Sequence, residues 1–415
     1  MRAAGASTRR LVLPLFGVAL AGCDGGSDQL GSATVSVDTT ATGVIQVSYS
    51  AIPAAPSFEL REDLRIGRDP DVVFGDIRGI ELAGDTAVLI LDAQASELRS
   101  FDLSGVERAL LARKGEGPHE IVSANGIRID HEGAVWINDH GKGRLTRLLP
   151  GGGVETMPRF VHSYGFRWEG GVTVDGRLWS HQTHSVTPTG PREPGIAEGV
   201  SRSYFLAFDP DTQATDSVLL GEDSYKSIAL PRGGVSMPFM PNRLQSLDPA
   251  GAIWTAWSGT YRLARLDPSE DTTLIVDVAA VGPAVSPEER AEEIADIEEF
   301  METAGRVHID WDAVIPETKP VLRQLVVDDH GNVWAQREVE ERTIFDGFGP
   351  EGLFLGHIVL PYTVSRYVPP VMKAGWFVGL HTDALGVQSV IGSRLPSALL
   401  QADGVKSDMN QEARP

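Results

Sequence analysis

Residues 130–136 have the sequence Asp-His-Glu-Gly-Ala-Val-Trp, and this short pattern recurs along the chain. Asp and Gly favour a tight turn, since Gly adopts positive φ without a steric cost, and the apolar residues that follow suit a buried strand. Trp residues at equivalent places would form a repeated layer between neighbouring sheets. Copies occur at residues 130–136, 175–179, 248–254 and 329–334, with weaker copies at residues 84–89 and 374–378.

A second pattern, an apolar strand that runs into a turn, follows the first pattern in most units. Together the two patterns predict about four short strands per unit, with the shortest intervals near 45 residues, which is typical of propeller blades. A β-sandwich would also contain short strands but would not repeat the pair of patterns six times. We therefore predict an all-β fold over residues 41–395, a six-bladed β-propeller of four-stranded blades. The second pattern occurs at residues 98–105, 145–151, 206–211, 263–269 and 344–352.

Two units are longer than the others. Residues 181–203 are rich in His, Thr, Pro and Gly and are expected to form a loop. Residues 286–305 begin with Ser-Pro-Glu-Glu, which supplies a helix N-cap, Pro at the first helical position and an acidic first turn. Residues 44–49 alternate as a strand, and we expect this N-terminal strand to close the ring by pairing near residues 387–391, because closure removes sheet edges.

The N-terminus has the features of an export signal. Arg2, Arg9 and Arg10 precede an apolar run at residues 11–19, which is shorter than a membrane span of about 20 residues. The run leads into Leu-Ala-Gly-Cys at residues 20–23, which resembles the lipobox of bacterial lipoproteins.

In lipoproteins the Cys thiol carries diacylglycerol and the chain is cut just before it. The resemblance implies a signal peptide at residues 1–22, a lipid on Cys23 and a flexible tether at residues 23–40, with a polar tail at residues 396–415. The propeller would then be held by its lipid to a bacterial membrane in the cell envelope, outside the cytoplasm and on the periplasmic side. Inner and outer membrane remain alternatives, as does a secretory signal without lipidation.

The charge of the chain limits its partners. The formal net charge is −21, so the surface repels phosphate backbones and argues against nucleic acid as a partner. Anionic lipid headgroups are repelled as well, and membrane contact therefore requires a specific anchor. Cys23 is the only cysteine, which excludes an intramolecular disulfide.

A loop after the first unit carries the family resemblance. Residues 113–120, Arg-Lys-Gly-Glu-Gly-Pro-His-Glu, resemble the Gly-Arg-Lys-Gly-Glu-Gly-Pro-Gly-Glu-Phe loop of bacterial six-bladed propellers related to NHL-repeat proteins. His119 replaces a usual Gly, and Ile121 replaces a usual Phe. The helical insertion and Pro-Glu-Thr-Lys-Pro at residues 316–320 are also similar to that family. The resemblance implies the fold over residues 41–395 but no activity, because one fold serves many functions.

Glu-Gly-Pro at residues 116–118 and Asn-Gly at residues 125–126 resemble motifs of the gluconolactonases, which are also six-bladed propellers. An enzymatic alternative is therefore a metal-dependent hydrolase or lyase of the gluconolactonase type. The resemblance would place Ca²⁺ or another divalent cation on Glu116, Asn125 and Asp139, whose oxygen atoms suit such ions. The three residues fall within about one blade, whereas the lactonases draw their ligands from several blades, so a structural turn is the favoured interpretation. His181 and His184 could also bind a metal, with solvated loop histidines as the favoured alternative.

The leading interpretation is a non-enzymatic binding or scaffold propeller that recognises a protein, peptide or glycan through its loop face. Tyr164, Arg167 and Trp168 are the candidate ligand-binding residues, because aromatic residues and Arg are frequent at binding hot spots. Core packing is the favoured interpretation for Phe166 and Trp168. No catalytic residue is assigned, and no cofactor is expected outside the enzymatic alternative.

Overall fold

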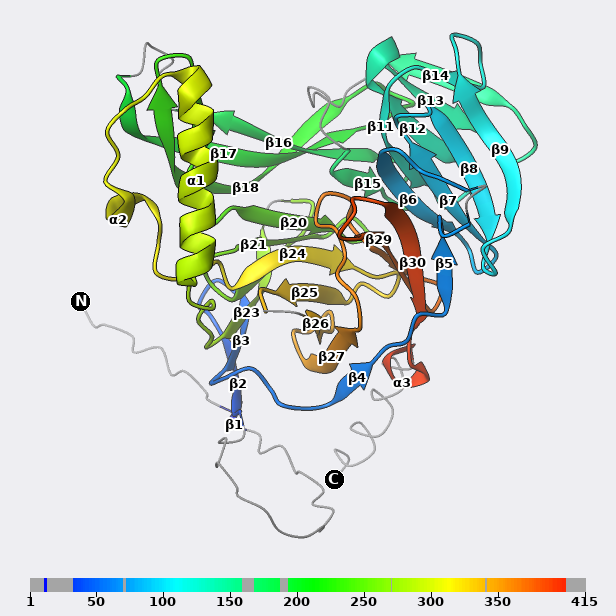
Figure 1. Cartoon of the computed structure of the whole chain (residues 1–415). Coiled ribbons are helices and arrows are strands. Elements are labelled where there is room, and N and C mark those ends of the chain that lie inside the picture. The colour runs from blue at the N-terminus through cyan, green and yellow to red at the C-terminus, as the bar shows by residue number, and fades with distance from the viewer. Residues whose placement is uncertain are drawn as a thin grey trace, which may run out of the picture.

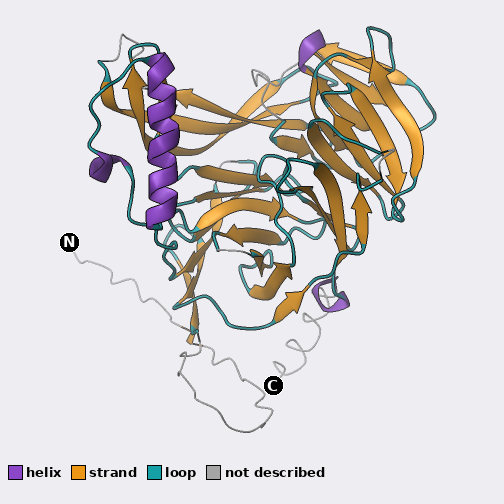
Figure 2. Ribbon diagram, viewed as in Figure 1, coloured by secondary structure: helices purple, strands orange, loops and turns teal. Residues whose placement is uncertain are grey.

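The computed structural model describes residues 11–12, 33–69, 72–158, 168–186, 193–269, 271–339 and 342–400; for residues 11–12 only the backbone is described. Their strands form six sheets arranged as the blades of a β-propeller, which are numbered 1 to 6 in chain order (Figures 1 and 2). The predicted six-bladed fold is therefore confirmed.

Blades 1 to 3 each arise from one continuous stretch of chain. Their strands pair in sequence order from the centre of the ring outwards, and the pairs are antiparallel except for β9 with β10, which is parallel. Blade 1 contains β6 (Ile77–Ala83), β7 (Ala87–Asp92), β8 (Glu97–Asp102), β9 (Glu107–Lys114) and the short β10 (Glu120–Ile121), blade 2 contains β11 (Ala124–Ile129), β12 (Val135–Asp139), β13 (Arg144–Leu148) and β14 (Val154–Pro158), and blade 3 contains β15 (Gly170–Val172), β16 (Leu178–Ser185), β17 (Gly195–Phe208), β18 (Thr215–Leu230) and β19 (Gly233–Ser236).

Blades 4 to 6 combine a continuous stretch with strands from the N-terminal region. The added strands are β1 (Leu11–Val12), β2 (Val35–Thr39), β3 (Ile45–Tyr49), β4 (Ser57–Glu59) and β5 (Leu64–Ile66). The other strands are β20 (Arg243–Leu247), β21 (Ile253–Trp257), β22 (Arg262–Leu266) and β23 (Thr272–Val278) in blade 4, β24 (Leu322–Val327), β25 (Val333–Arg337), β26 (Thr343–Phe348) and β27 (Phe354–Leu360) in blade 5, and β28 (Val371–Lys373), β29 (Trp376–Thr382) and β30 (Gln388–Arg394) in blade 6.

The repeated Asp-x-x-Gly pattern forms the turn between the first and second strands of a blade. In blade 2, the carboxylate of Asp130 accepts hydrogen bonds from the backbone amides of Glu132 and Ala134, and Gly133 has a φ of +81°. The other oxygen of Asp130 accepts from the indole Nε1 of Trp136 at 2.9 Å. Blade 5 repeats this arrangement. The repeat is therefore a turn that holds its own Trp.

Each Trp of the repeat packs against the next blade. A hydrophobic cluster fills each of the six blade interfaces, as expected for a closed ring. The five second-strand Trp residues are 3% exposed or less and belong to five different clusters; they are Trp136, Trp179, Trp254, Trp334 and Trp376. The predicted Trp layer between blades is confirmed.

The N-terminal strap, residues 33–66, runs along the outside of blades 4, 5 and 6. β3 pairs in parallel with β23, β4 pairs in parallel with β27, and β5 pairs antiparallel with β30 as the fourth strand of blade 6. The expectation that residues 44–49 close the ring near residues 387–391 was therefore wrong. Alternation identified β3 as a strand, but its buried residues Val47 and Tyr49 pack between blades 4 and 5, and β5 makes the closure.

The ends of the predicted domain differ slightly from the structure. β2 lies inside the segment expected to be a tether and pairs with β3. At the other end, the short α3 (Ser397–Leu400) lies within the predicted polar tail, where Leu399 is buried against blades 5 and 6. Residues 401–415 lie outside the described residues.

Residues 181–203 were expected to form a loop, and this was wrong for their described part. β16, β17 and β18 are long strands that continue past the ring as a twisted sheet (Figure 1). Its side chains are largely small or polar and half-exposed, so composition indicated a loop while cross-strand pairing decides the structure. We call residues 183–186, 193–203 and 221–236 the blade 3 extension.

The predicted helix is confirmed as α1 (Pro287–Ala304), with Ser286 as N-cap in a complete capping box and Pro287 at the first helical position. α1 packs on the blade 3 extension, where Ile297 and Met301 contact a cluster that includes Ile228. The short α2 (Trp311–Val314) follows. Both insertions therefore lie together, on the side of the ring where β20 and β24 begin (Figure 1), which we call the insertion face.

Candidate functional site

A cavity of about 2360 Å³ opens on the insertion face and continues along the central channel. Its walls come from the blade 3 extension, α1, the innermost strands of the blades and residues 363–370 before β28. Small-molecule sites usually enclose roughly 300–1,000 Å³. The cavity therefore has room for a ligand larger than a small metabolite.

Inside the channel, charged side chains from blades 1 and 2 pair with each other. Arg128 on β11 lies 3.3 Å from the carboxylate of Glu81 on β6 and donates to the carbonyl of Gly170 at 2.7 Å. Burial raises the pKa of Glu81, while the positive charges of Arg128 and Lys373 act against that rise. Because Glu81 and Arg128 pair with each other, this part of the lining needs no charge from a ligand to balance it.

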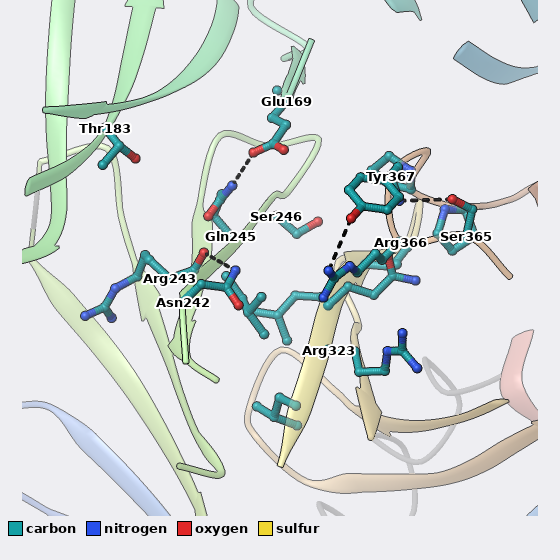
Figure 3. Close-up of a pocket in the computed structure, with 18 of the residues that line it drawn as sticks. Glu169, Thr183, Asn242, Arg243, Gln245, Ser246, Arg323, Ser365, Arg366 and Tyr367 are labelled. Atoms are coloured by element: carbon teal, nitrogen blue, oxygen red, sulfur yellow. Dashed lines mark hydrogen bonds between the residues drawn. The ribbon is translucent and has the colours of Figure 1, made fainter. Parts of the chain in front are cut away.

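A second polar pair joins blades 3 and 4. The side-chain amide of Gln245 donates to Glu169 Oε2 at 2.9 Å (Figure 3). Nδ1 of His181 lies 3.2 Å from the same oxygen. Among the residues that the structure describes, Oε1 of Gln245 and Nε2 of His181 have no hydrogen-bond partner. His181, one of the two histidines considered as metal ligands, thus contacts a carboxylate.

Gln324 on β24 is the least satisfied polar side chain of the cavity. It is only 7% exposed and lines the cavity, yet within the described part of the chain neither its amide nitrogen nor its carbonyl oxygen has a partner. Leaving a buried polar group unpaired costs about 1–3 kcal/mol, and such groups in native proteins require an explanation. A ligand that supplies both a donor and an acceptor would give the Gln324 amide the partners that it lacks.

A cluster of cations lies where blade 5 meets the residues before blade 6. Arg323 makes two contacts with Glu338, the shorter at 3.0 Å, and Lys319 contacts Glu289 of α1 at 2.6 Å. Burial raises the pKa of Glu338, and the charges of Arg323, Lys319 and Arg366 act against that rise. We call these five residues the cation cluster, and all five line the cavity.

Arg366 differs from the other cations of this cluster. Its guanidinium donates to the hydroxyl of Tyr367 at 3.3 Å and lies 5.2 Å from the centre of the same ring (Figure 3). No carboxylate of the described residues lies within ion-pair distance of Arg366. With three cations and two carboxylates, the cation cluster carries a formal charge of +1 in a protein of net charge −21.

The cavity also has an apolar part. Residues 237–241, Met-Pro-Phe-Met-Pro, line it between the blade 3 extension and β20, and we call them the apolar loop. Phe239 has a φ of +52°, which is rare for a bulky residue. Its side chain and that of Met240 are partly buried and pack beside the α1 cluster. Backbone strain of this kind is concentrated at functional sites.

The residues predicted to bind a metal are not brought together as a metal site. Both carboxylate oxygens of Asp139 accept backbone hydrogen bonds, from Val122 and Ser123 at 3.0 Å each, so Asp139 ties the end of β12 to the start of β11. Asn125 is buried and accepts from a neighbouring Asn on β12 at 2.5 Å. The Glu116 side chain is 84% exposed. The described residues contain no group of three or more His, Cys, Asp or Glu that could hold a metal ion.

The predicted ligand-binding residues are only partly described. Tyr164 and Arg167 lie outside the described residues, as does Cys23. Trp168 is 1% exposed, and its indole Nε1 donates to the carbonyl of Trp179 at 2.8 Å. Its side chain therefore packs in the core between blades 2 and 3.

Sequence reasoning missed Gln324, Arg366 and the apolar loop. One signal for Gln324 was available, since a Gln interrupts the apolar run of residues 322–327, Leu-Arg-Gln-Leu-Val-Val. No signal marked Arg366, because its place in the cavity depends on how blades 5 and 6 meet. The structure brings these residues together from distant parts of the chain.

Comparisons with known proteins show similarity in fold. No family model matches the sequence, and no curated protein matches it. A protein of Bacteroides fragilis assigned as exported is similar in structure at 10% identity and a TM-score of 0.46, covering 85% of this chain and 100% of that one. A member of the DUF4221 family from Bacteroides vulgatus has 9% identity and a TM-score of 0.46, covering 81% and 97%. A gluconolactonase from Xanthomonas campestris has 13% identity and a TM-score of 0.39, covering 82% and 99%.

At these identities and TM-scores, the similarity carries no functional conclusion. None of the helices in the described ranges is long and apolar enough to cross a membrane. The six sheets of the described residues, with α1 as a helical insertion, make the fold a six-bladed β-propeller.

Proposed function

We propose that this protein is a non-enzymatic binding propeller that holds an extended polar ligand, a peptide or a glycan, in the cavity on the insertion face. The observation that carries the proposal is Gln324, a buried amide with neither polar atom paired among the described residues, at the wall of a cavity of about 2360 Å³. A ligand with hydrogen-bonding groups would relieve this cost on binding.

The rest of the cavity supports the same proposal. Gln245 offers a further acceptor, Arg366 offers a guanidinium outside any ion pair within the described chain, and residues 237–241 offer apolar contact. Binding sites typically combine an apolar lining with a few placed polar groups. The cavity has this composition, although its volume suits a longer ligand.

We also propose that the propeller acts outside the cytoplasm on a lipid attached to Cys23. The support is the sequence of residues 1–23, with its basic start, apolar run and lipobox-like end. The two or three acyl chains of a lipoprotein suffice for stable anchoring, since one chain alone binds a membrane only marginally.

A capture experiment with two ligand collections tests the binding proposal. The purified protein is immobilised and exposed to a pool of random hexapeptides and to a set of oligosaccharides, and the retained molecules are identified by mass spectrometry. Gln324→Met keeps the size of the side chain but removes both polar atoms. Gln336→Met is the matched control, because Gln336 lies directly opposite Gln324 on the next strand and does not line the cavity.

We expect wild type and Gln336→Met to retain ligands of one class, and Gln324→Met to retain markedly less. Retention of nothing by the wild type, or equal retention by all three proteins, would refute the proposal.

A further inference from the structure

The cation cluster has one positive charge more than it needs for its own carboxylates. Arg323 is engaged by Glu338 through two contacts, and Lys319 is engaged by Glu289 at 2.6 Å. Arg366 has Tyr367 as its only polar partner among the residues that the structure describes. Its planar guanidinium presents several donors in a fixed fork that matches a carboxylate or a phosphate.

Arg366 is placed to meet a ligand inside the cavity. It lies on the segment before β28, and Figure 3 shows it with Arg323 on the opposite side of the cavity from Glu169 and Gln245. Arg366 is an exposed residue, so its guanidinium is open to a ligand that enters the cavity.

The same cavity contains hydrogen-bonding and apolar groups that suit a peptide. Gln324 offers both a donor and an acceptor, which a peptide unit matches with its C=O and N–H. The apolar loop, residues 237–241, adds Met and Phe side chains, and Met adapts to ligands of varied shape. A glycan would leave most of this apolar surface without a partner.

The charge of the whole protein restricts the ligand to few negative charges. With a net charge of −21, the surface repels an acidic polymer before it reaches the cavity. A single carboxylate at the end of an otherwise neutral chain avoids most of that repulsion. The C-terminus of a peptide supplies such a group whatever the sequence.

We propose that the cation cluster binds the C-terminal carboxylate of an extended peptide, with Arg366 as the direct contact, while Gln324 and the apolar loop receive the preceding residues. This inference rests on the proposed function, and it adds the class of ligand and its orientation in the cavity.

Three hexapeptide pools test the inference on the purified protein. The first pool lacks Asp and Glu and has free C-termini, the second has the same composition with amidated C-termini, and the third is amidated but contains Asp and Glu. A set of neutral and uronic-acid oligosaccharides forms a fourth arm. Retention is measured for wild type, Arg366→Gln and Arg306→Gln. Arg306 is the matched control because its side chain is 72% exposed and does not line the cavity.

We expect wild type and Arg306→Gln to retain the free-acid pool and to lose the amidated pools. Arg366→Gln should retain the free-acid pool roughly ten- to a hundredfold less, the range for a hydrogen bond between charged groups. Glu338→Gln should retain it more strongly than the wild type, because a competing negative charge is removed. Thermal unfolding of each variant checks that the fold is intact.

The outcomes separate this inference from the proposed function. Equal retention of the free-acid and first amidated pools would overturn the carboxylate site and leave peptide binding in place. Retention of the third pool alone would assign the charge to a side chain and overturn the C-terminal orientation. Capture of oligosaccharides only would overturn the peptide class, and capture of nothing would overturn the proposed function as well.

Discussion

Two buried polar side chains of this propeller, Asp130 and Gln324, have opposite surroundings. Asp130 in the blade 2 turn accepts hydrogen bonds from two backbone amides, from the indole of Trp136 and from Arg147 at 2.8 Å. Gln324 in the cavity wall has no partner within the described residues. The fold pairs the polar atoms of the first side chain and leaves those of the second unpaired, and the proposal places the ligand beside the second.

The comparison predicts its largest effect at Asp130. Asp130→Ala removes the acceptor of five hydrogen bonds and leaves the Trp136 indole without a partner, so we expect the free energy of unfolding to fall by about 3 kcal/mol. Chemical denaturation measures the change. Asp211→Ala, in an exposed turn, is the control and should change stability by less than about 0.5 kcal/mol. A loss below 1 kcal/mol at Asp130 would contradict the account of the repeat.

The Asp130 interactions also predict a dependence on pH. Burial alone would raise the pKa of Asp130, but hydrogen bonds from Arg147, Trp136 and Ala134 outweigh it and hold that pKa below its usual value. A carboxyl with a lowered folded-state pKa stabilises the fold above its ordinary pKa, about 3.9, and this stabilisation is lost as pH falls through the lowered value.

Asp130→Asn should therefore differ most from the wild type at neutral pH, and the difference should shrink below about pH 4. Unfolding curves of both proteins from pH 7 to pH 2 test this. A constant difference over the whole range would show that charge on Asp130 does not contribute.

Substitution of Gln324 should affect stability in the opposite direction from substitution of Asp130. Gln324→Met removes an unpaired buried amide, so we expect stability to be unchanged or to rise by about 1 kcal/mol, while ligand retention falls. Thermal unfolding and capture are measured on the same preparation. A loss of stability as large as that of Asp130→Ala would mean that Gln324 serves the fold.

The smallest expected effect concerns Glu338. Burial raises the pKa of Glu338 against the charges of Arg323, Lys319 and Arg366, and the charge of Glu289 raises it further. Protonation of Glu338 as pH falls from 7 towards that raised pKa removes a charge that competes with an anionic ligand. Affinity for a free-acid peptide should then rise as the pH falls, since the peptide C-terminus, with a pKa near 3.5, stays ionised until lower pH. Glu338→Gln should remove this dependence, and an unchanged pH profile in that variant would contradict the assignment.

The sequence predicted the ring because its signals are local. The turn residues and the Trp that follows them lie within seven residues, so a clear copy could be recognised alone, and four clear copies with two weaker ones give the blade count. The capping box of α1 is local in the same sense. Strand partners were less predictable than the strands themselves. Residues 45–49 alternate as a strand whichever blade they join, and only packing decides that they pair with β23.

The candidate site could be predicted less well than the fold. The sequence suggested a cation site at Glu116, Asn125 and Asp139. In the structure Asp139 accepts hydrogen bonds from two backbone amides, and the Glu116 side chain is exposed. Gln324 and Arg366 are ordinary residues in the sequence. Their significance lies in a missing partner and an unmatched charge, and these properties arise only when the blades and insertions come together.

The most direct test of the central claim is a crystal structure of the protein with a peptide retained from the free-acid pool. We expect a peptide inside the cavity on the insertion face, with its C-terminal carboxylate within hydrogen-bond distance of Arg366 and a peptide unit paired with the amide of Gln324. A peptide bound at an outer blade edge, or in the cavity with Gln324 still unpaired, would contradict it.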